Sequence, residues 1–562
     1  MNKNFSYIKP HRYLVNEKAT ILEAMKVIEQ GEERVCFIID EHEKLIKVIS
    51  DGDIRRSLLQ NLDLKKKVIE IHNNDPKVIH EEQIYEQVEK VLNKNNLIAP
   101  VVNKQGKIVG VLRYKDVIPQ IDIRSYKVTI IGLGYVGLTL GLVMADQGFS
   151  IYGLDKDKKL IAQLKNKEAP FHEKGIEHYI NKHVNKSLKI GSDEEIINSD
   201  IYIITVGTPI NNISKKPEVK NILEAASIIG KKLKKNDLVV LRSTVPIGCT
   251  RKIVIPKLEE VSKLSTGKDF SVAFCPERTA EGRALEELKN LPQIVGGFDK
   301  KSRELGMRLF SENTHTVIDI GSLEAAEMCK LMDNTYRDTR FAFANQMAEL
   351  SEKYGLNINH LINKVNLSYE RNTIPFPSPG VGGACLSKDP YILINNFEEN
   401  NLDCSLTRAS RKINEEAPIN IFNKTKKFMD SVGKEITKAK IFIIGLAFKG
   451  EPETSDLRDS TTVWFINKLK ENGVFNLWGF DPIVEEGDIE KLNIIPCTLE
   501  EGFNGADAVF IMNNHKSYLS INLSLLLEKM NKSSYFFDGW NIFDANDFVS
   551  FPGITYSGIG LK

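Results

Sequence analysis

The stretch KVTIIGLGYVG, residues 127–137, predicts the fold of most of the chain. An apolar strand leads directly into a glycine pattern that opens a helix, as in a dinucleotide-binding turn. Gly132 permits the tight turn, Gly134 lets the backbone approach a pyrophosphate, and Gly137 lets the helix pack on the strand. The free N–H groups at the helix N-terminus favour phosphate binding. The sequence therefore predicts a Rossmann-type cofactor site, to which we also assign Tyr135 and Val136.

An acidic residue completes this predicted site. Asp155 ends the next strand, 18 residues after Gly137. A carboxylate there accepts hydrogen bonds from both ribose hydroxyls and repels a 2′-phosphate, so we expect NAD in preference to NADP. Three nearby lysines weaken that preference: Lys156, Lys158 and Lys159.

Strands and helices continue to alternate after Asp155. Strands are expected at 150–154, 201–205, 238–242 and 271–274. Helical patterns separate them, which favours a parallel, doubly wound sheet. Two strands end in similar turns, TVGTP (205–209) and RSTVPIG (242–248). Ligands of such sheets bind outside the carboxyl ends of the strands, so Thr208 and Thr244 are expected to face the cofactor.

The second half of the chain begins differently. From Gly321 to about Phe428 no strand is predicted, and residues 322–355 read as one long amphipathic helix with Ser322 as its N-cap. A second alternating segment runs from KAKIFIIGLAFKG (438–450) to YFFDGWN (535–541). The expected fold class is α/β, with two Rossmann-like domains joined by a long central helix.

The first 120 residues contain a repeat at an offset of 63. VCFIIDEHEKLIKVISDGDI (35–54) aligns without gaps on IAPVVNKQGKIVGVLRYKDV (98–117). Each copy reads as a helix, two strands joined by a turn, and a helix start, so the two copies are expected to pack as a pseudo-twofold pair.

This repeat resembles a tandem pair of CBS domains, over residues 10–120. The resemblance implies that a hydroxyl residue shortly before an Asp holds the ribose and phosphate of an adenine nucleotide. Ser50 and Asp53 fit in the first copy, whereas the second keeps Asp116 but has Arg113 in place of the hydroxyl. An equally open alternative is that Ser50 and Asp53 only cap a helix.

Composition excludes several classes of partner. The 562 residues carry 76 Lys+Arg and 75 Asp+Glu, so neither nucleic acid nor a membrane surface is expected. Seven dispersed cysteines without a CxxC pair indicate neither a disulfide framework nor a metal site, and favour a reducing cytoplasm. The N-terminus lacks the apolar core of a signal peptide. Residues 128–145 form an uncharged run, but four glycines interrupt it.

Cys385 lies in PSPGVGGACLSKDPY (377–391), between a glycine stretch and the pair Lys388-Asp389. It could be a nucleophile, a metal ligand or a buried thiol. No Cys or His at usable spacing accompanies it, which argues against a metal ligand. The residues alone leave the other two interpretations open.

Eight motifs, in order, resemble those of the UDP-glucose/GDP-mannose dehydrogenase family over residues 127–562. They are GLGYVG, TVGTP, STVPIG, PERTAEG, a helix with K-x-x-x-N, GGACLSKD, GLAFK and SDLRDS. The resemblance implies oxidation of the C6 alcohol of a nucleotide-linked hexose to a carboxylate, using two NAD in succession. The expected domains are the CBS pair (1–124), an NAD-binding domain (125–320), a central helical domain with the Cys385 loop and dimer contacts (321–436), and a UDP-sugar-binding domain (437–562).

The resemblance also implies roles for the residues around Cys385. Cys385 would attack an aldehyde, giving a thiohemiacetal and then a thioester. Lys388 and Lys330 would lower the thiol pKa or stabilise a negative oxygen, and Asp389 would position or activate water. Lys330 and Asn334 are four positions apart and project from one helical face, where they would hold the reacting oxygen.

The remaining assignments follow from the other motifs. Glu277 is the implied general acid or base and contacts the substrate with Lys330 and Asn334. The other substrate contacts are Phe376, Gly382 and Lys449. The other cofactor contacts are Glu281, Lys388 and Arg458. His515 is given no catalytic role.

The substrate is expected to be a UDP-N-acetylhexosamine, such as UDP-N-acetylmannosamine (UDP-ManNAc) or UDP-N-acetylglucosamine (UDP-GlcNAc), oxidised for surface polysaccharide. PERTAEGRALEEL and PSPGVGG look like that branch, whereas CLSKD keeps a lysine common in the glucose and GDP-mannose branches. UDP-glucose 6-dehydrogenase and GDP-mannose 6-dehydrogenase stay open as alternatives. So do a two-electron hydroxyacid-type dehydrogenase and a non-catalytic nucleotide sensor. The family implies a homodimer or higher homo-oligomer formed through the helix at 322–355.

Overall fold

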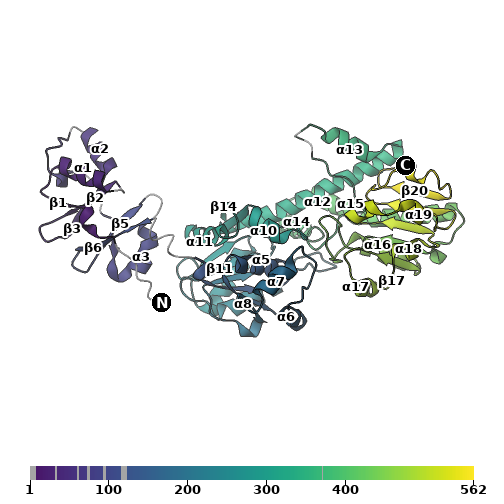
Figure 1. The fold of residues 1–562 in the computed structure, drawn as a ribbon, viewed down its shortest axis with the longest axis horizontal. Coiled ribbons are helices and arrows are strands. Elements are labelled where there is room, and N and C mark those ends of the chain that lie inside the picture. The colour runs from purple at the N-terminus through teal and green to yellow at the C-terminus, as the bar shows by residue number, and fades with distance from the viewer. Residues whose placement is uncertain are drawn as a thin grey trace. The chain divides into compact units, whose positions relative to one another are not determined.

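The computed structural model describes residues 8–31, 34–59, 62–71, 76–92, 96–114, 123–369, 371 and 373–561. The chain divides into two compact units, Met1–Ser125 and Tyr126–Lys562. Figure 1 follows it from the purple N-terminal unit to the yellow C-terminal sheet. Among the described helices, none is both long and apolar enough to cross a membrane. The uncharged run at 128–145 instead forms most of a strand, a turn and most of a helix.

The N-terminal unit contains two small sheets, one from each copy of the repeat. The first copy comprises β1 (Leu14–Asn16), α1 (Ile21–Gln30), β2 (Val35–Ile39), β3 (Leu45–Ser50) and α2 (Asp51–Leu59). The second comprises β4 (Ile79–His80), α3 (Ile84–Val91), β5 (Ile98–Val102) and β6 (Ile108–Arg113). In both sheets the first strand pairs parallel with the second, and the second antiparallel with the third. The predicted repeat is therefore confirmed.

Equivalent residues of the two copies meet. Lys44 and Lys107, which the 63-residue offset superposes, pair with each other in an antiparallel bridge. The core shared by the copies also contains both members of three equivalent pairs, namely Val35 and Ile98, Leu45 and Ile108, and Val48 and Val111. A residue contacts its own equivalent only near a twofold axis, so the pair has the expected pseudo-twofold arrangement.

The second unit begins with an eight-stranded sheet of order β14-β13-β12-β11-β10-β7-β8-β9. Its strands are β7 (Lys127–Ile131), β8 (Ser150–Asp155), β9 (Leu188–Ser192), β10 (Ile201–Ile204), β11 (Leu238–Leu241), β12 (Ser271–Phe274), β13 (Gln293–Gly297) and β14 (Val317–Ser322). Its helices are α5 (Tyr135–Asp146), α6 (Lys158–Lys165), α7 (Ile176–His183), α8 (Lys220–Gly230), α9 (Ile255–Ser262), α10 (Ala284–Asn290) and α11 (Lys300–Ser311). Strands β9, β8, β7, β10, β11 and β12 follow the Rossmann order 3-2-1-4-5-6.

A helical segment follows the first sheet. It comprises α12 (Leu323–Tyr354), α13 (Ile358–Asn366), α14 (Asp389–Glu399) and α15 (Ser405–Ser431). Ser322 caps α12 by accepting from the Ala325 N–H at 3.1 Å, as predicted, and Gly355 ends the helix in a left-handed conformation. Helix α12 packs against α14 and α15.

The C-terminal sheet is parallel throughout, with the order β17-β16-β15-β18-β19-β20. Its strands are β15 (Ile441–Ile444), β16 (Leu477–Phe480), β17 (Ile495–Pro496), β18 (Ala508–Ile511), β19 (Ser534–Asp538) and β20 (Ile554–Gly558). Its helices are α16 (Thr461–Glu471), α17 (Glu486–Lys491), α18 (Leu499–Phe503) and α19 (Leu523–Leu527). This order is again 3-2-1-4-5-6, so the chain holds two Rossmann-like sheets, as predicted.

Candidate active site

The glycine turn after β7 has the geometry of a dinucleotide site. Gly132 has φ +97°, and a Cβ on Gly137 would lie 1.8 Å from the Gly132 carbonyl oxygen. A Cβ on Gly134 would meet nothing within 4 Å. Gly132 and Gly137 are therefore needed by the protein itself, whereas Gly134 leaves open space above the N-terminus of α5.

A cavity of about 230 Å³ lies beside this turn, between the carboxyl ends of β7 and β10. It is lined by Ile131, Gly132, Gly134, Asp155, Lys156, Asp193, Thr205, Val206, Gly207, Asn221, Glu224 and Ala225. This is the switch point of the sheet, where such folds bind nucleotides. An open glycine turn, Asp155 and the buried, unpartnered Oδ1 of Asp193 together fit the adenosine and phosphate end of NAD.

The other predicted cofactor residues have different surroundings. Thr208 is buried, and its hydroxyl has no hydrogen-bond partner among the described residues, while Thr244 is half-buried. Val136 is half-buried. Tyr135 donates its hydroxyl to the buried Glu173, and both accept from the Gly282 N–H. Tyr135 therefore ties the cofactor turn to the PERTAEG segment.

One face of α12 carries four buried polar residues that serve successive parts of the site. Glu327 accepts from the N–H groups of Gly248, at 2.5 Å, and Thr250, at 2.8 Å, and so fixes the STVPIG turn. Lys330 and Asn334 follow on the same face, 6% and 3% exposed, and Asp338 is fully buried. The sequence did not mark Glu327 and Asp338 as site residues, because a charged residue in an amphipathic helix is usually on the solvent face.

Asp389 is clamped beneath the loop of Cys385. It is fully buried at the start of α14, where one carboxylate oxygen accepts from Asn334 Nδ2 and the other from Lys388 Nζ, each at 2.6 Å. The structure thus brings Asn334, Lys388 and Asp389 together. Lys330 forms no hydrogen bond with any described residue, although its charge acts on both Glu277 and Cys385.

Cys385 is exposed on its loop, which rules out a simple buried thiol. The surrounding protein limits hydration of the thiolate, and this effect and the charge of Asp389 raise the pKa of Cys385. Lys330 and Lys388 lower it, as expected from the sequence, but do not outweigh the other two effects. The pKa of Cys385 therefore stays above its ordinary value, because limited hydration and the charge of Asp389 outweigh the two lysines.

The loop itself is held from two sides. Gly383 has φ +86°, and a Cβ there would lie 2.6 Å from the Phe448 ring, so the loop fits directly against the GLAFK segment. From the other side, Arg411 pairs with Asp338 at 2.6 Å and donates to the Leu386 carbonyl at 3.1 Å. Both ionic side chains are at most 1% exposed.

Glu277 is held as an anion. Arg242 Nη2 donates to its carboxylate at 2.6 Å, and both groups are buried. Burial opposes the charge, but Arg242 and Lys330 outweigh it and hold the pKa of Glu277 at about 2. A carboxylate with so low a pKa is a weak proton acceptor, so its surroundings favour an electrostatic or binding role.

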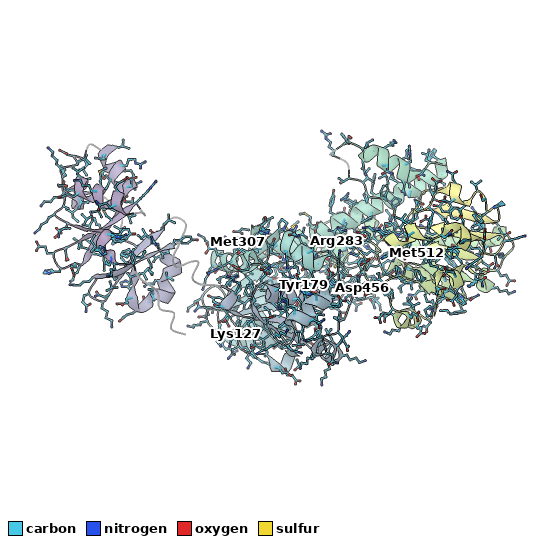
Figure 2. All side chains as sticks on the ribbon, in the orientation of Figure 1. Lys127, Tyr179, Arg283, Met307, Asp456 and Met512 are labelled. Atoms are coloured by element: carbon cyan, nitrogen blue, oxygen red, sulfur yellow. The ribbon has the colours of Figure 1, made fainter. Side chains whose placement is uncertain are left out.

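A charged group forms where the two Rossmann-like domains meet. Burial and the neighbouring Asp456 raise the pKa of Glu281 to about 7. Arg458 Nη2 lies 3.5 Å from Glu281 and 2.6 Å from Asp456, and Lys449 Nζ donates to the Glu281 carbonyl at 2.7 Å. Figure 2 shows Asp456 at this junction, near Arg283, which pairs with Glu451 at 2.7 Å. Phe376 is exposed and Gly382 buried.

In the N-terminal unit, Ser50 and Asp53 form a helix cap. Asp53 Oδ2 accepts from the Ser50 hydroxyl at 2.6 Å and from its N–H at 2.8 Å, and Arg56 pairs with the other oxygen at 2.6 Å. This is the arrangement of the capping alternative. Asp116 lies outside the described residues.

The fold and the site define a dinucleotide-dependent dehydrogenase class. Models of the UDP-glucose/GDP-mannose dehydrogenase family match three successive segments: the NAD binding domain at 126–314, the central domain at 324–416 and the UDP binding domain at 442–545. CBS domain models match 1–60 and 68–122.

Known proteins agree with these matches. UDP-N-acetyl-D-mannosamine dehydrogenase of Pyrococcus horikoshii is 31% identical over 77% of this chain and 99% of its own. The solved structure of UDP-D-ManNAc dehydrogenase from Pyrococcus horikoshii has a TM-score of 0.70, with the same coverage and identity. That of UDP-N-acetyl-mannosamine dehydrogenase from Staphylococcus aureus has a TM-score of 0.66 and 28% identity, covering 77% of this chain and 98% of that one. The chain belongs to the UDP-glucose/GDP-mannose dehydrogenase family, and is an NAD-dependent nucleotide-sugar dehydrogenase with N-terminal CBS domains.

Two glycine substitutions separate fold from cofactor binding. In Gly137→Ala the new Cβ would lie 1.8 Å from the Gly132 carbonyl oxygen, so we expect a lower melting temperature and little NAD binding. Gly134→Ala meets no protein atom, so we expect a wild-type melting temperature but NAD binding about tenfold weaker, because the methyl occupies the approach to the pyrophosphate. Scanning fluorimetry and calorimetry measure both. Wild-type NAD affinity in a folded Gly134→Ala protein would contradict this assignment.

Proposed function

We propose that this chain oxidises the C6 hydroxyl of a UDP-N-acetylhexosamine, UDP-ManNAc or UDP-GlcNAc, to a carboxylate, removing four electrons for surface polysaccharide synthesis. The observation that carries the proposal is the exposed Cys385 thiol on a loop that also places Lys388 and Asp389 beside Asn334. The relatives named for UDP-ManNAc support this sugar class. UDP-glucose and GDP-mannose are the alternative substrates.

The need for a thiol follows from the second oxidation. An aldehyde has no hydroxyl to oxidise until a nucleophile adds to it. The Cys385 sulfur bonds to the aldehyde carbon and the thiol proton passes to the oxygen, giving a neutral thiohemiacetal. Loss of the carbon-bound hydrogen with its electron pair, and of the hydroxyl proton, gives a thioester. Water then hydrolyses it to the carboxylate and a proton, and restores the thiol. NAD, when bound, accepts the electron pair in each oxidation.

The charged residues around Cys385 support this chemistry. The Lys330 ammonium, which no described residue binds, is available to stabilise a developing negative oxygen. Asn334 and Asp389 hold each other, and Lys388 neutralises Asp389, so the group that positions water stays fixed. In the proposal Glu277 contributes a fixed negative charge that interacts with Lys330.

The sugar nucleotide is proposed to bind between the two Rossmann-like domains. Lys449 and Arg458 carry positive charge there, next to Glu281 and close to the Cys385 loop, which suits a diphosphate. Phe376 and the backbone at Gly382 are proposed as further substrate contacts, and Glu281, Lys388 and Arg458 as contacts near the nicotinamide.

A second copy of the chain is the proposed partner of α12. Six large apolar side chains recur there every four or seven residues and are 49–73% exposed: Met328, Met332, Tyr336, Phe343, Leu350 and Tyr354. This spacing places them along one face of the helix. An exposed apolar stripe of this length supports a homodimer or larger homo-oligomer.

The CBS pair is proposed to bind an adenine nucleotide near Ser50 and Asp53, with the Ser50 hydroxyl shared between the α2 cap and the nucleotide. Calorimetry on the full chain with AMP and ATP tests this, with saturating NAD present to occupy the Rossmann site. We expect binding in the wild type and weaker binding in Ser50→Ala. Heats that are absent, or identical in the two proteins, would contradict the proposal.

The stoichiometry of NADH formation tests the proposed reaction. With UDP-glucose, UDP-GlcNAc, UDP-ManNAc, UDP-GalNAc and GDP-mannose in parallel, we expect two NADH per sugar and the highest kcat/KM for UDP-ManNAc or UDP-GlcNAc. Cys385→Ser should lower uronate release by at least about 1,000-fold, because a hydroxyl is a poor substitute for the thiol. Cys497→Ser, which changes a partly exposed thiol directly after β17, serves as control. One NADH per sugar would indicate a two-electron enzyme.

Charges on the α12 stripe should break the dimer. We expect Tyr336→Glu/Phe343→Glu to elute as a monomer in size-exclusion chromatography with light scattering, while the wild type is at least a dimer, because burying two carboxylates in an apolar interface is costly. Leu519→Glu/Leu525→Glu changes two equally exposed apolar residues of the C-terminal domain and should leave the mass unchanged. An unchanged mass in the α12 variant would place the interface elsewhere.

A further inference from the structure

The cavity beside the glycine turn contains more acidic residues than the turn itself uses. Asp193 and Glu224 line it together with Asp155. The two carboxylate oxygens of Asp155 already accept backbone N–H groups, one from Leu133 at 2.7 Å and the other from Asp157 at 2.9 Å. Part of the hydrogen-bonding capacity of Asp155 is thus used by the protein backbone.

The Oδ1 atom of Asp193 accepts no such backbone hydrogen bond among the described residues. Asp193 opens a short turn, Asp193–Glu195, directly after β9, yet the N-cap of that turn is Ser192 and no side chain caps it. Asp193 Oδ1 is completely buried and has no hydrogen-bond partner among the described residues. Burial, and then the charge of Asp155, raise the pKa of Asp193. A buried acceptor without a donor costs folding free energy, so this carboxylate is poised to gain from a donor brought by a ligand.

The single lysine of the cavity lining does not balance these charges. Lys156 Nζ donates to Asn221 at 2.9 Å and lies 3.6 Å from Glu224. Its charge is therefore paired with Glu224 and also acts on Asp193, so a single lysine faces the three carboxylates of the described lining. Of the three lysines that weakened the sequence-based preference for NAD, Lys156 is thus already bound to Asn221 and Glu224.

We propose that Asp193 is a second specificity-determining residue of the adenosine end of the NAD site. Its carboxylate accepts a hydrogen bond from a ribose hydroxyl and, with Asp155, repels a 2′-phosphate. A 2′-phosphate would bring about two negative charges toward two carboxylates in a partly desolvated cavity. Discrimination against NADP then depends on the pair rather than on Asp155 alone.

Asp193→Asn tests the proposal, because the amide keeps the shape and removes the charge. Dissociation constants for NAD and NADP are measured by calorimetry on the full-length protein with no sugar present, so the result is independent of the proposed substrate. We expect NADP to bind about tenfold more tightly than to the wild type and NAD about two- to fivefold more weakly. Glu194→Gln, an exposed neighbour outside the cavity lining, should leave both constants unchanged.

Two further variants, Glu224→Gln and Asp193→Ser, extend the test and cover the case in which Asp193→Asn does not fold. Glu224→Gln frees Lys156, so NADP binding should improve further when it is combined with Asp193→Asn. If Asp193→Asn does not fold, as judged by its melting temperature, Asp193→Ser replaces it in the same measurements. A ratio of NADP to NAD affinity within twofold of wild type in a folded Asp193 variant would overturn the proposal.

Discussion

The buried ion pair between Asp338 and Arg411 is the constraint on which the reaction centre depends. It joins α12 to α15, and Arg411 also donates to the Leu386 carbonyl next to Cys385. Removing one member of such a pair leaves an uncompensated buried charge, which typically costs about 3–5 kcal/mol. Asn414 extends the contact by donating to Asp338 at 2.8 Å and accepting from Asn345 at 3.0 Å. The reactive loop therefore has a rigid support although its thiol is exposed.

The two Rossmann-like domains fix their first turns by the same interaction. In the NAD-binding domain the carboxylate of Asp155 accepts from the Leu133 N–H at 2.7 Å, and in the C-terminal domain Asp481 accepts from the Leu446 N–H at 2.8 Å. In each domain the acid lies at the carboxyl end of the second strand in chain order, where Asp155 ends β8 and Asp481 follows β16, and the N–H follows the first strand. One turn borders the NAD cavity, whereas the other is part of GLAFK (445–449), against which the Cys385 loop packs.

Much of this architecture could be predicted because it depends on local pattern. The glycine turn, the repeat, the long helix with its Ser322 cap and the shared face of Lys330 and Asn334 are all set by short-range spacing. The sequence did not predict three of the strands, because their alternation of apolar residues is too weak: β9, the Gly-containing β13 and the two-residue β17. The hydrogen bond from Asn334 to Asp389 and the burial of Glu327 could not be predicted, since they join residues far apart in sequence. The net rise in the Cys385 pKa could not be predicted either, because it depends mainly on how far the folded protein limits hydration of the thiolate.

The buried polar face of α12 limits how the length of this helix can vary in evolution. The face is formed by Glu327, Lys330, Asn334 and Asp338. Over about 16 Å of one helix it holds the STVPIG turn through Glu327, places the Lys330 ammonium proposed to face the reacting oxygen, binds Asp389 through Asn334, and supports the Cys385 loop through Asp338. Each added or lost residue rotates everything beyond it by about 100°, so a single-residue insertion inside this stretch would separate these functions at once. Length variation among related chains should therefore be confined to loops such as the one after β10, and this part of α12 should keep its length even where its sequence diverges.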